Sequence, residues 1–260
     1  MTTLSHPQDA ANRIGLALPL AAVFMRFGFI MLGNGLAWLI FSAQGHPTPW
    51  NQALLWGNVH VTLVADPLTI AFLLWAVRRE GLTLRDLVGF GQSPLIKDVL
   101  LGLGITVLLA ITLFVGNLIG ALVAFGPAVF TQPVAPLDAA LLPPLGYYLW
   151  ALIVLPVTVG ITEELAYRGY AQPRLEAATG SRWLGLLIMA FGFGVQHIAF
   201  SMTDWQSALA RFVGTFIAGI VFGLIYMKQR RLLPLIIGHW VVNAVFLGLF
   251  PLLGYLMTVG

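Results

Sequence analysis

The feature that most constrains the fold of this chain is a set of long apolar runs that recur from one end to the other. They cover residues 14–41, 51–77, 99–125, 147–166, 183–200, 207–227 and 232–257. A helix that crosses the roughly 30 Å hydrocarbon core of a bilayer needs about 20 apolar residues. Charged residues make up only 9% of the chain, against about 25% in a soluble domain. The sequence therefore predicts an all-α, polytopic transmembrane helical bundle of about seven spans, because a barrel would show short alternating segments instead.

The composition also narrows the chemistry and the partners. The chain contains no cysteine, which excludes a disulfide, a thiol nucleophile and a cysteine-ligated metal. The net charge of +3 is small, so we expect the lipid bilayer as a partner and no nucleic acid. Residues 1–13 are polar, and no small-residue cleavage site follows a short apolar core. We therefore expect the first apolar run to be a retained span and not a signal peptide.

The distribution of lysine and arginine predicts how the spans are oriented. These residues are dense at positions 78–97, 168–182 and 228–231, whereas the loops at 42–51 and 126–144 contain none. Cytoplasmic loops of membrane proteins carry an excess of lysine and arginine. The sequence thus predicts a cytoplasmic N-terminus and a C-terminus on the other side of the membrane.

One stretch places three ionisable groups beside an apolar run. Residues 161–170 contain Glu163, Glu164 and Arg168, at the expected end of the fourth span. An ionised side chain in a bilayer costs at least about 2.5–3.5 kcal/mol, so such residues usually have a function. Glu164 and Arg168 are four residues apart and share a helix face, whereas Glu163 points elsewhere. We therefore expect one paired carboxylate and one free carboxylate, Glu163, that can act as a general base.

Two further spans contain polar groups at helical spacing. Phe193 and His197 are four residues apart in the fifth expected span. His239 and Asn243 have the same spacing in the seventh. If these faces converge on Glu163, the pocket can activate water and stabilise an oxyanion. Two histidines and a carboxylate are also the ligands of many hydrolytic zinc sites, so a divalent metal such as zinc stays open, although no HExxH sequence is present.

These residues resemble the three signature motifs of the CPBP intramembrane protease family. That family includes type II CAAX prenyl endopeptidases and Abi-like bacteriocin-immunity proteins. The chain contains the motifs in the expected order, as Glu163-Glu164 with Arg168, Phe193 with His197, and His239 with Asn243. The resemblance covers about residues 86–250. It implies an intramembrane metalloprotease or glutamate endopeptidase of a bacterial inner membrane, with a cavity open to the cytoplasmic side and a membrane-associated protein or peptide, prenylated or not, as substrate.

The resemblance also implies a role for each residue. The catalytic set is Glu163, Glu164, His197, His239 and Asn243, with Arg168 and Phe193 as structural support. Glu163 would activate a water molecule near His197. His239 and Asn243 would hold the tetrahedral oxyanion, and the pair of Glu164 and Arg168 would fix Glu163. A metal, if one takes part, would be bound by His197 and His239.

The other polar and small residues are expected to be structural. Arg26, His60 and Asp66 would form a hydrogen-bond network between the first two spans, and Ser181 would cap the fifth span. Close helix packing is expected at Gly102, Gly104, Gly116 and Gly120. We expect residues 1–85 to comprise the tail and the first two spans, and residues 86–260 to form the protease core, within one integrated membrane domain.

Two other functions are compatible with the same polar residues. A small transporter could use them as an ion or proton path, although no repeated halves with broken spans are visible in the sequence. A non-catalytic scaffold or immunity protein could use the pocket for structure alone. The substitution Glu163→Gln separates these possibilities, because it preserves the shape of the side chain and removes the base.

Overall fold

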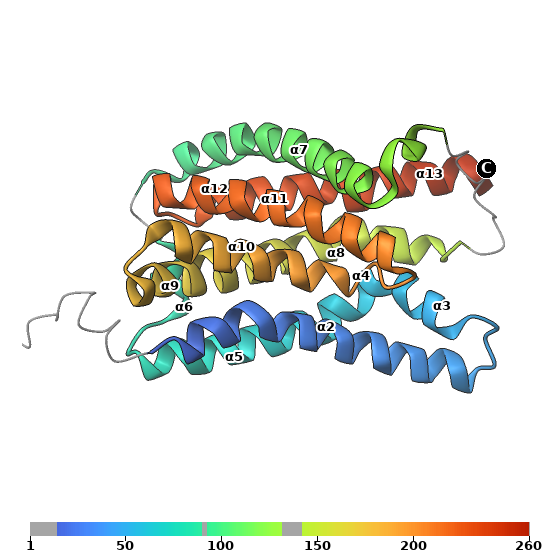
Figure 1. Cartoon of the computed structure of the whole chain (residues 1–260), viewed down its shortest axis with the longest axis horizontal. Helices are drawn as coiled ribbons and strands as arrows, with labels where there is room; N and C mark the ends of the chain where they lie inside the picture. Colours follow the sequence, from blue (N-terminus) through green and yellow to red (C-terminus); the bar gives the residue numbers. More distant parts are fainter. Residues whose placement is uncertain (1–14, 90–92, 132–141, 260) are drawn as a thin grey trace, which may run out of the picture.

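The computed structural model describes residues 15–89, 93–131 and 142–259, and every regular element within these ranges is a helix. The polar tail at 1–13 and part of the proline-rich loop expected at 126–144 lie outside them. The helices run lengthwise beside one another as a bundle (Figure 1). Within the described ranges, six segments are long and apolar enough to cross a membrane: Ala17–Ala43, Gly57–Arg79, Leu95–Phe130, Leu145–Thr179, Trp205–Gln229 and Leu233–Val259. The expected integral membrane protein is thereby confirmed.

Apart from the fourth span, which continues to Thr179, the spans begin and end close to the predicted apolar runs. The first half of the chain contains α2 (Ala17–Ala43), α3 (Pro49–Leu55), α4 (Gly57–His60), η1 (Val61–Ala65), α5 (Asp66–Arg79), α6 (Leu84–Val88), α7 (Leu95–Phe125) and η2 (Gly126–Phe130). The second half contains α8 (Leu145–Glu163), η4 (Glu164–Ala171), α9 (Gln172–Thr179), α10 (Arg182–Ile198), α11 (Trp205–Gln229), α12 (Leu233–Asn243), η5 (Ala244–Leu249) and α13 (Phe250–Val259).

The fifth expected span corresponds to α10, which is shorter than the six long segments. It has 17 residues, at the lower limit of the range for a helix that crosses a bilayer. It begins as predicted, because the Ser181 side chain accepts a hydrogen bond from the Leu184 backbone N–H at 3.3 Å. The fourth span differs from the prediction, because Glu163 lies near the middle of a helical segment that continues to Thr179. Residues 164–171 are all buried, which explains why the helix extends beyond the motif.

Most basic residues lie at one end of the bundle, which we call the basic end. The end of α5, α6, the start of α7, α9, the start of α10, the end of α11 and the start of α12 meet there, on the left in Figure 1. Ion pairs connect these elements: Arg174 with Glu80, Arg230 with Glu176 and Arg231 with Asp98. In the short helix α6, the Thr83 backbone N–H and hydroxyl both donate to the Asp86 carboxylate at 2.7 Å, which lowers the pKa of that carboxyl.

The opposite end of the bundle, which we call the charge-poor end, is tied together by neutral hydrogen bonds. The Trp50 indole N–H donates to the Met202 carbonyl at 2.9 Å. The Tyr147 hydroxyl donates to the Leu55 carbonyl at 2.9 Å. The turn before α3, the start of α8, the turn before α11 and the end of α13 lie at this end (Figure 1).

Glycines allow α7 and α11 to pack closely, as the sequence predicted for most of them. A Cβ on Gly116 would lie 2.8 Å from the Gly214 carbonyl oxygen, and one on Gly120 would overlap the Ala210 carbonyl. Gly102 makes the same kind of approach to the start of α12. Gly104 has no atom within 4 Å of a built Cβ, so the prediction is wrong there.

Candidate active site

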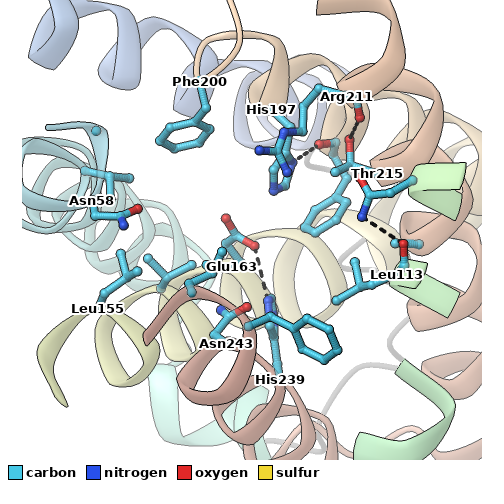
Figure 2. A pocket seen from close by; sticks show the side chains of 18 of the residues that line it. Asn58, Leu113, Leu155, Glu163, His197, Phe200, Arg211, Thr215, His239 and Asn243 are labelled. Atoms are coloured by element: carbon cyan, nitrogen blue, oxygen red, sulfur yellow. Dashed lines mark hydrogen bonds and ion pairs between the residues drawn. The ribbon is translucent and has the colours of Figure 1, made fainter. Parts of the chain in front are cut away.

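A pocket inside the bundle brings the predicted site residues together. It has a volume of about 380 Å³ and is lined by Glu163 from α8, His197 and Phe193 from α10, and His239 and Asn243 from α12. Figure 2 shows Glu163 in the centre of the labelled side chains, with His197 on one side and His239 and Asn243 on the other. Glu164 and Arg168 do not line the pocket, and each is completely buried behind it.

Glu163 is buried but not free of partners, which differs from the prediction. Its Oε1 atom accepts a hydrogen bond from Gln196 Nε2 at 3.0 Å and lies 3.5 Å from Arg26 NH2. Its Oε2 atom lies 3.7 Å from His239 Nε2 and has no hydrogen-bond partner among the residues described. One oxygen of this carboxylate is thus held by donors, and the other is left for a small polar ligand such as water.

Glu164 connects a buried arginine to His239. Its Oε1 atom accepts from Arg168 NH1 at 3.3 Å, which confirms the predicted pair, and lies 2.9 Å from His239 Nδ1. Because an ionised carboxylate can only accept, the hydrogen of this second bond is on Nδ1. His239 therefore turns its Nε2 atom toward Glu163 and the pocket.

Two aromatic rings hold the Arg168 guanidinium in place. Its Cζ atom lies 4.3 Å from the Phe193 ring centroid and 4.7 Å from that of Phe222. The Phe222 ring also contacts the His239 ring, with centroids 4.9 Å apart. Phe193 thus touches the guanidinium, as befits the support that the resemblance implied, and Phe222 is an additional contact that the sequence did not indicate.

The last two site residues present unbonded polar groups to the pocket. His197 Nδ1 lies 2.7 Å from the Phe193 carbonyl oxygen, so Nδ1 carries the hydrogen and Nε2 keeps its lone pair. The Asn243 side chain lines the pocket, and no hydrogen bond from it to another described residue is found. A carboxamide in this state can donate to an oxygen atom of a bound molecule.

The helices that carry Glu163 and Asn243 change their winding just after these residues. The π-helical segment η4 begins at Glu164, and η5 begins at Ala244. A third π-helical segment, η1, ends immediately before Asp66. Such segments are rare and occur frequently at functional sites. They shift the following side chains around the helix axis, which no local sequence pattern reveals.

The first two spans contribute to this site, which the sequence did not indicate. Arg26 NH1 pairs with Asp66 Oδ1 at 2.6 Å, as predicted for an interspan network, but the same guanidinium reaches Glu163. His60 is not part of the network, because its Nε2 atom bonds to the Ala53 carbonyl at 3.1 Å instead. Gln196 was also missed, although it stands next to His197 in the sequence. A glutamine inside an apolar run was the available signal in the sequence, and the structure shows that its side chain is fully buried.

The donors in the described part of the chain do not fit a bound metal ion. No three histidine, aspartate or glutamate side chains there converge closely enough to hold one. His197 and His239 each have one nitrogen engaged by a protein oxygen.

Comparison with known proteins finds a family model that matches part of the chain. Residues 145–245 match the family model described as type II CAAX prenyl endopeptidase Rce1-like. No curated protein and no solved structure matches the chain. The matched segment begins at the start of α8, ends in η5 and contains every motif residue from Glu163 to Asn243. Over residues 145–245, the chain is thus similar to the Rce1-like type II CAAX prenyl endopeptidases.

Proposed function

We propose that this protein is an intramembrane endopeptidase that hydrolyses a peptide bond of a membrane-associated protein or peptide with water activated by Glu163. The observation that carries this proposal is the Oε2 atom of Glu163, a buried carboxylate oxygen that lines the pocket and lacks a hydrogen-bond partner among the residues described. The family match supports the same activity.

The first chemical step is attack by water. A water molecule bound between Glu163 Oε2 and His239 Nε2, which are 3.7 Å apart, would also face the lone pair of His197. Glu163 takes a proton from this water, and the oxygen forms a bond to the carbonyl carbon of the substrate. Gln196 and Arg26 keep the other carboxylate oxygen in place, so that Oε2 stays directed at the water.

The second step is the collapse of the tetrahedral intermediate. Its oxyanion accepts a hydrogen bond from the Asn243 amide and lies beside the His239 ring. The Glu164 carboxylate, paired with Arg168, lies against His239 Nδ1 and keeps that ring in place. The carbon–nitrogen bond then breaks, and the leaving amine takes the proton from Glu163. The products are a carboxylic acid and an amine, and Glu163 returns to its ionised state.

The test is proteolysis by purified wild-type protein and by Glu163→Gln. Each is reconstituted with a membrane protein fraction, and new peptide termini are identified by mass spectrometry. Loss of a general base reduces the rate by about 10²–10⁴-fold, so the new termini should disappear in the variant. Glu176→Gln is the matched control, because Glu176 forms an ion pair with the exposed Arg230 at the basic end, away from the pocket.

A non-catalytic scaffold would give a different result. It would bind its partner equally well with glutamate or glutamine at position 163 and would release no peptide in either case. Equal sets of termini from wild type and Glu163→Gln would contradict the proposed peptidase.

The position in the membrane is part of the proposal. We place the protein in a bacterial inner membrane with the basic end in the cytoplasm, α10 as a seventh crossing and residues 86–260 as the protease core. The support is the grouping of basic residues at one end of the bundle and the length of α10.

A further inference from the structure

The pocket is closed toward the basic end and more open away from it. At its inner limit, Glu163 is 2% exposed, Phe222 1% and His239 5%. Beyond these residues toward the basic end, Arg168, Tyr167 and Leu232 are fully buried. Packed side chains thus separate the site from the end of the bundle where the resemblance placed its opening.

The rest of the pocket wall extends toward the charge-poor end. Leu55 precedes the first turn of α4, Tyr147 stands in the first turn of α8, and Phe200 follows α10. Leu55 and Tyr147 are joined by a hydrogen bond that belongs to the charge-poor end. From Glu163 back to Tyr147 the helix spans 16 residues, or about 24 Å at 1.5 Å per residue. The pocket wall therefore reaches from the middle of the bundle to the charge-poor end.

Exposure increases along the same direction. Leu55 is 39% exposed and Phe246 and Leu247 are each 36% exposed, although all three line the pocket. Asn117 near the end of α7 is also exposed and offers a polar group. The pocket wall is therefore less tightly covered by the protein toward the charge-poor end than at its inner limit.

The side of the membrane follows from the charges. Basic loops and helix ends stay in the cytoplasm, so the charge-poor end lies outside it. Arg211 is the one arginine or lysine among the described residues that line the pocket. Figure 2 shows it beside His197 on the pocket wall, and its Nε donates to Ser201 Oγ at 3.3 Å. The Arg211 side chain lies in the pocket and not in a loop. Its positive charge therefore does not contradict a membrane orientation that is inferred from basic loops and helix ends.

We infer that the pocket admits its ligand from the extracytoplasmic side of the membrane. The occupant that fits is a membrane-anchored peptide segment located outside the cytoplasm, with apolar side chains for the leucine and phenylalanine wall and a negatively charged group for Arg211. The identity of this ligand as a peptide rests on the proposed function. The side of access does not depend on the proposed peptide hydrolysis, because it follows only from the shape of the pocket and the distribution of basic residues.

The absence of cysteine makes a direct test possible, because each introduced cysteine is the only thiol in the chain. Three single variants are compared: Asn117→Cys in the pocket wall, Thr203→Cys on the charge-poor surface and Lys228→Cys on the basic surface. Intact cells are treated with a membrane-impermeant maleimide, and the same treatment is repeated on inverted membrane vesicles. Labelling needs no catalytic activity, so this result is independent of the outcome for Glu163→Gln.

The expected result is that Asn117→Cys and Thr203→Cys react in intact cells, and that Lys228→Cys reacts only in inverted vesicles. Reaction of Asn117→Cys from the same side as Lys228→Cys would overturn the inference. So would reaction of Lys228→Cys in intact cells, because the basic end would then lie outside. Failure of Asn117→Cys to react from either side, while it reacts after denaturation, would show that the mouth is closed to water and would overturn it as well.

Discussion

The buried arginine in the first span should be one of the largest single determinants of stability in this protein. Arg26 is fully buried and faces two carboxylates, Asp66 at 2.6 Å and Glu163 at 3.5 Å. Replacement with methionine keeps much of the volume and leaves both carboxylates without their cation. Breaking a buried pair from one side costs about 3–5 kcal/mol. Because two acids lose their partner here, we expect Arg26→Met to reach the upper part of that range.

The structure also predicts that the two partners are unequal. Asp66→Asn leaves Arg26 with Glu163 as a counter-charge, so its cost should be clearly smaller than that of Arg26→Met. The double variant Arg26→Met/Asp66→Asn lacks the Asp66 carboxylate, so it has one unpaired negative charge fewer than Arg26→Met alone. The double variant should therefore be more stable than Arg26→Met alone, which is a coupling that a double-mutant cycle measures.

The assay is reversible unfolding in mixed micelles or bicelles, followed by tryptophan fluorescence or by hydrogen exchange. Wild type, both single variants and the double variant are measured under one condition. If Arg26→Met lies within about 1 kcal/mol of wild type, the buried ion network is not an energetic unit and the reasoning fails. Equal costs for Arg26→Met and Asp66→Asn would contradict the role assigned to Glu163 as the second partner.

Three further predictions follow from the packing and the site. Gly120→Val should destabilise the contact of α7 with α11 by about 1–3 kcal/mol in the same unfolding assay, whereas the control Gly104→Ala should have little effect because its surroundings are open. Gln196→Leu removes the donor to Glu163 Oε1, a bond to a charged group worth about 1.5–3 kcal/mol, so kcat should fall about ten- to a hundredfold with little change in KM. A similar rise in KM would instead indicate a role in binding. Dialysis against a chelator should leave the cleavage rate unchanged, because the described donors do not converge on a metal position, and activity that zinc restores after dialysis would refute this.

The parts of the structure that could be predicted from the sequence are those with a local signal. Apolar runs gave the helices to within a few residues, and the four-residue spacing of Glu164 and Arg168 gave their ion pair. The spacing of His239 and Asn243 likewise placed both on one face toward the pocket. Pro251 stands in the first turn of α13, and this helix continues to Val259.

The parts that could not be predicted depend on contacts between distant residues or on backbone detail. The approach of Arg26 to Glu163 joins residues 137 positions apart, and no periodicity links them. The second span was expected to be continuous, but the helix is interrupted at Trp56, between α3 and α4. The pocket wall draws on α3, α4, η1, α7, α8, α10, α11, α12 and η5, and which of their faces remain unfilled is decided by packing in three dimensions.

The closed inner limit of the pocket has a consequence for turnover. Because packed side chains lie beyond His239, a fragment cleaved by the proposed peptidase would have to leave along the wall by which the intact chain arrived. The cleaved fragment and the next substrate would then compete for the same passage, and product release would be the rate-limiting step of each cycle. Such a protein would show a rapid first turnover followed by a slower steady rate, and its inhibition by its own product would increase with the length of the fragment that remains inside.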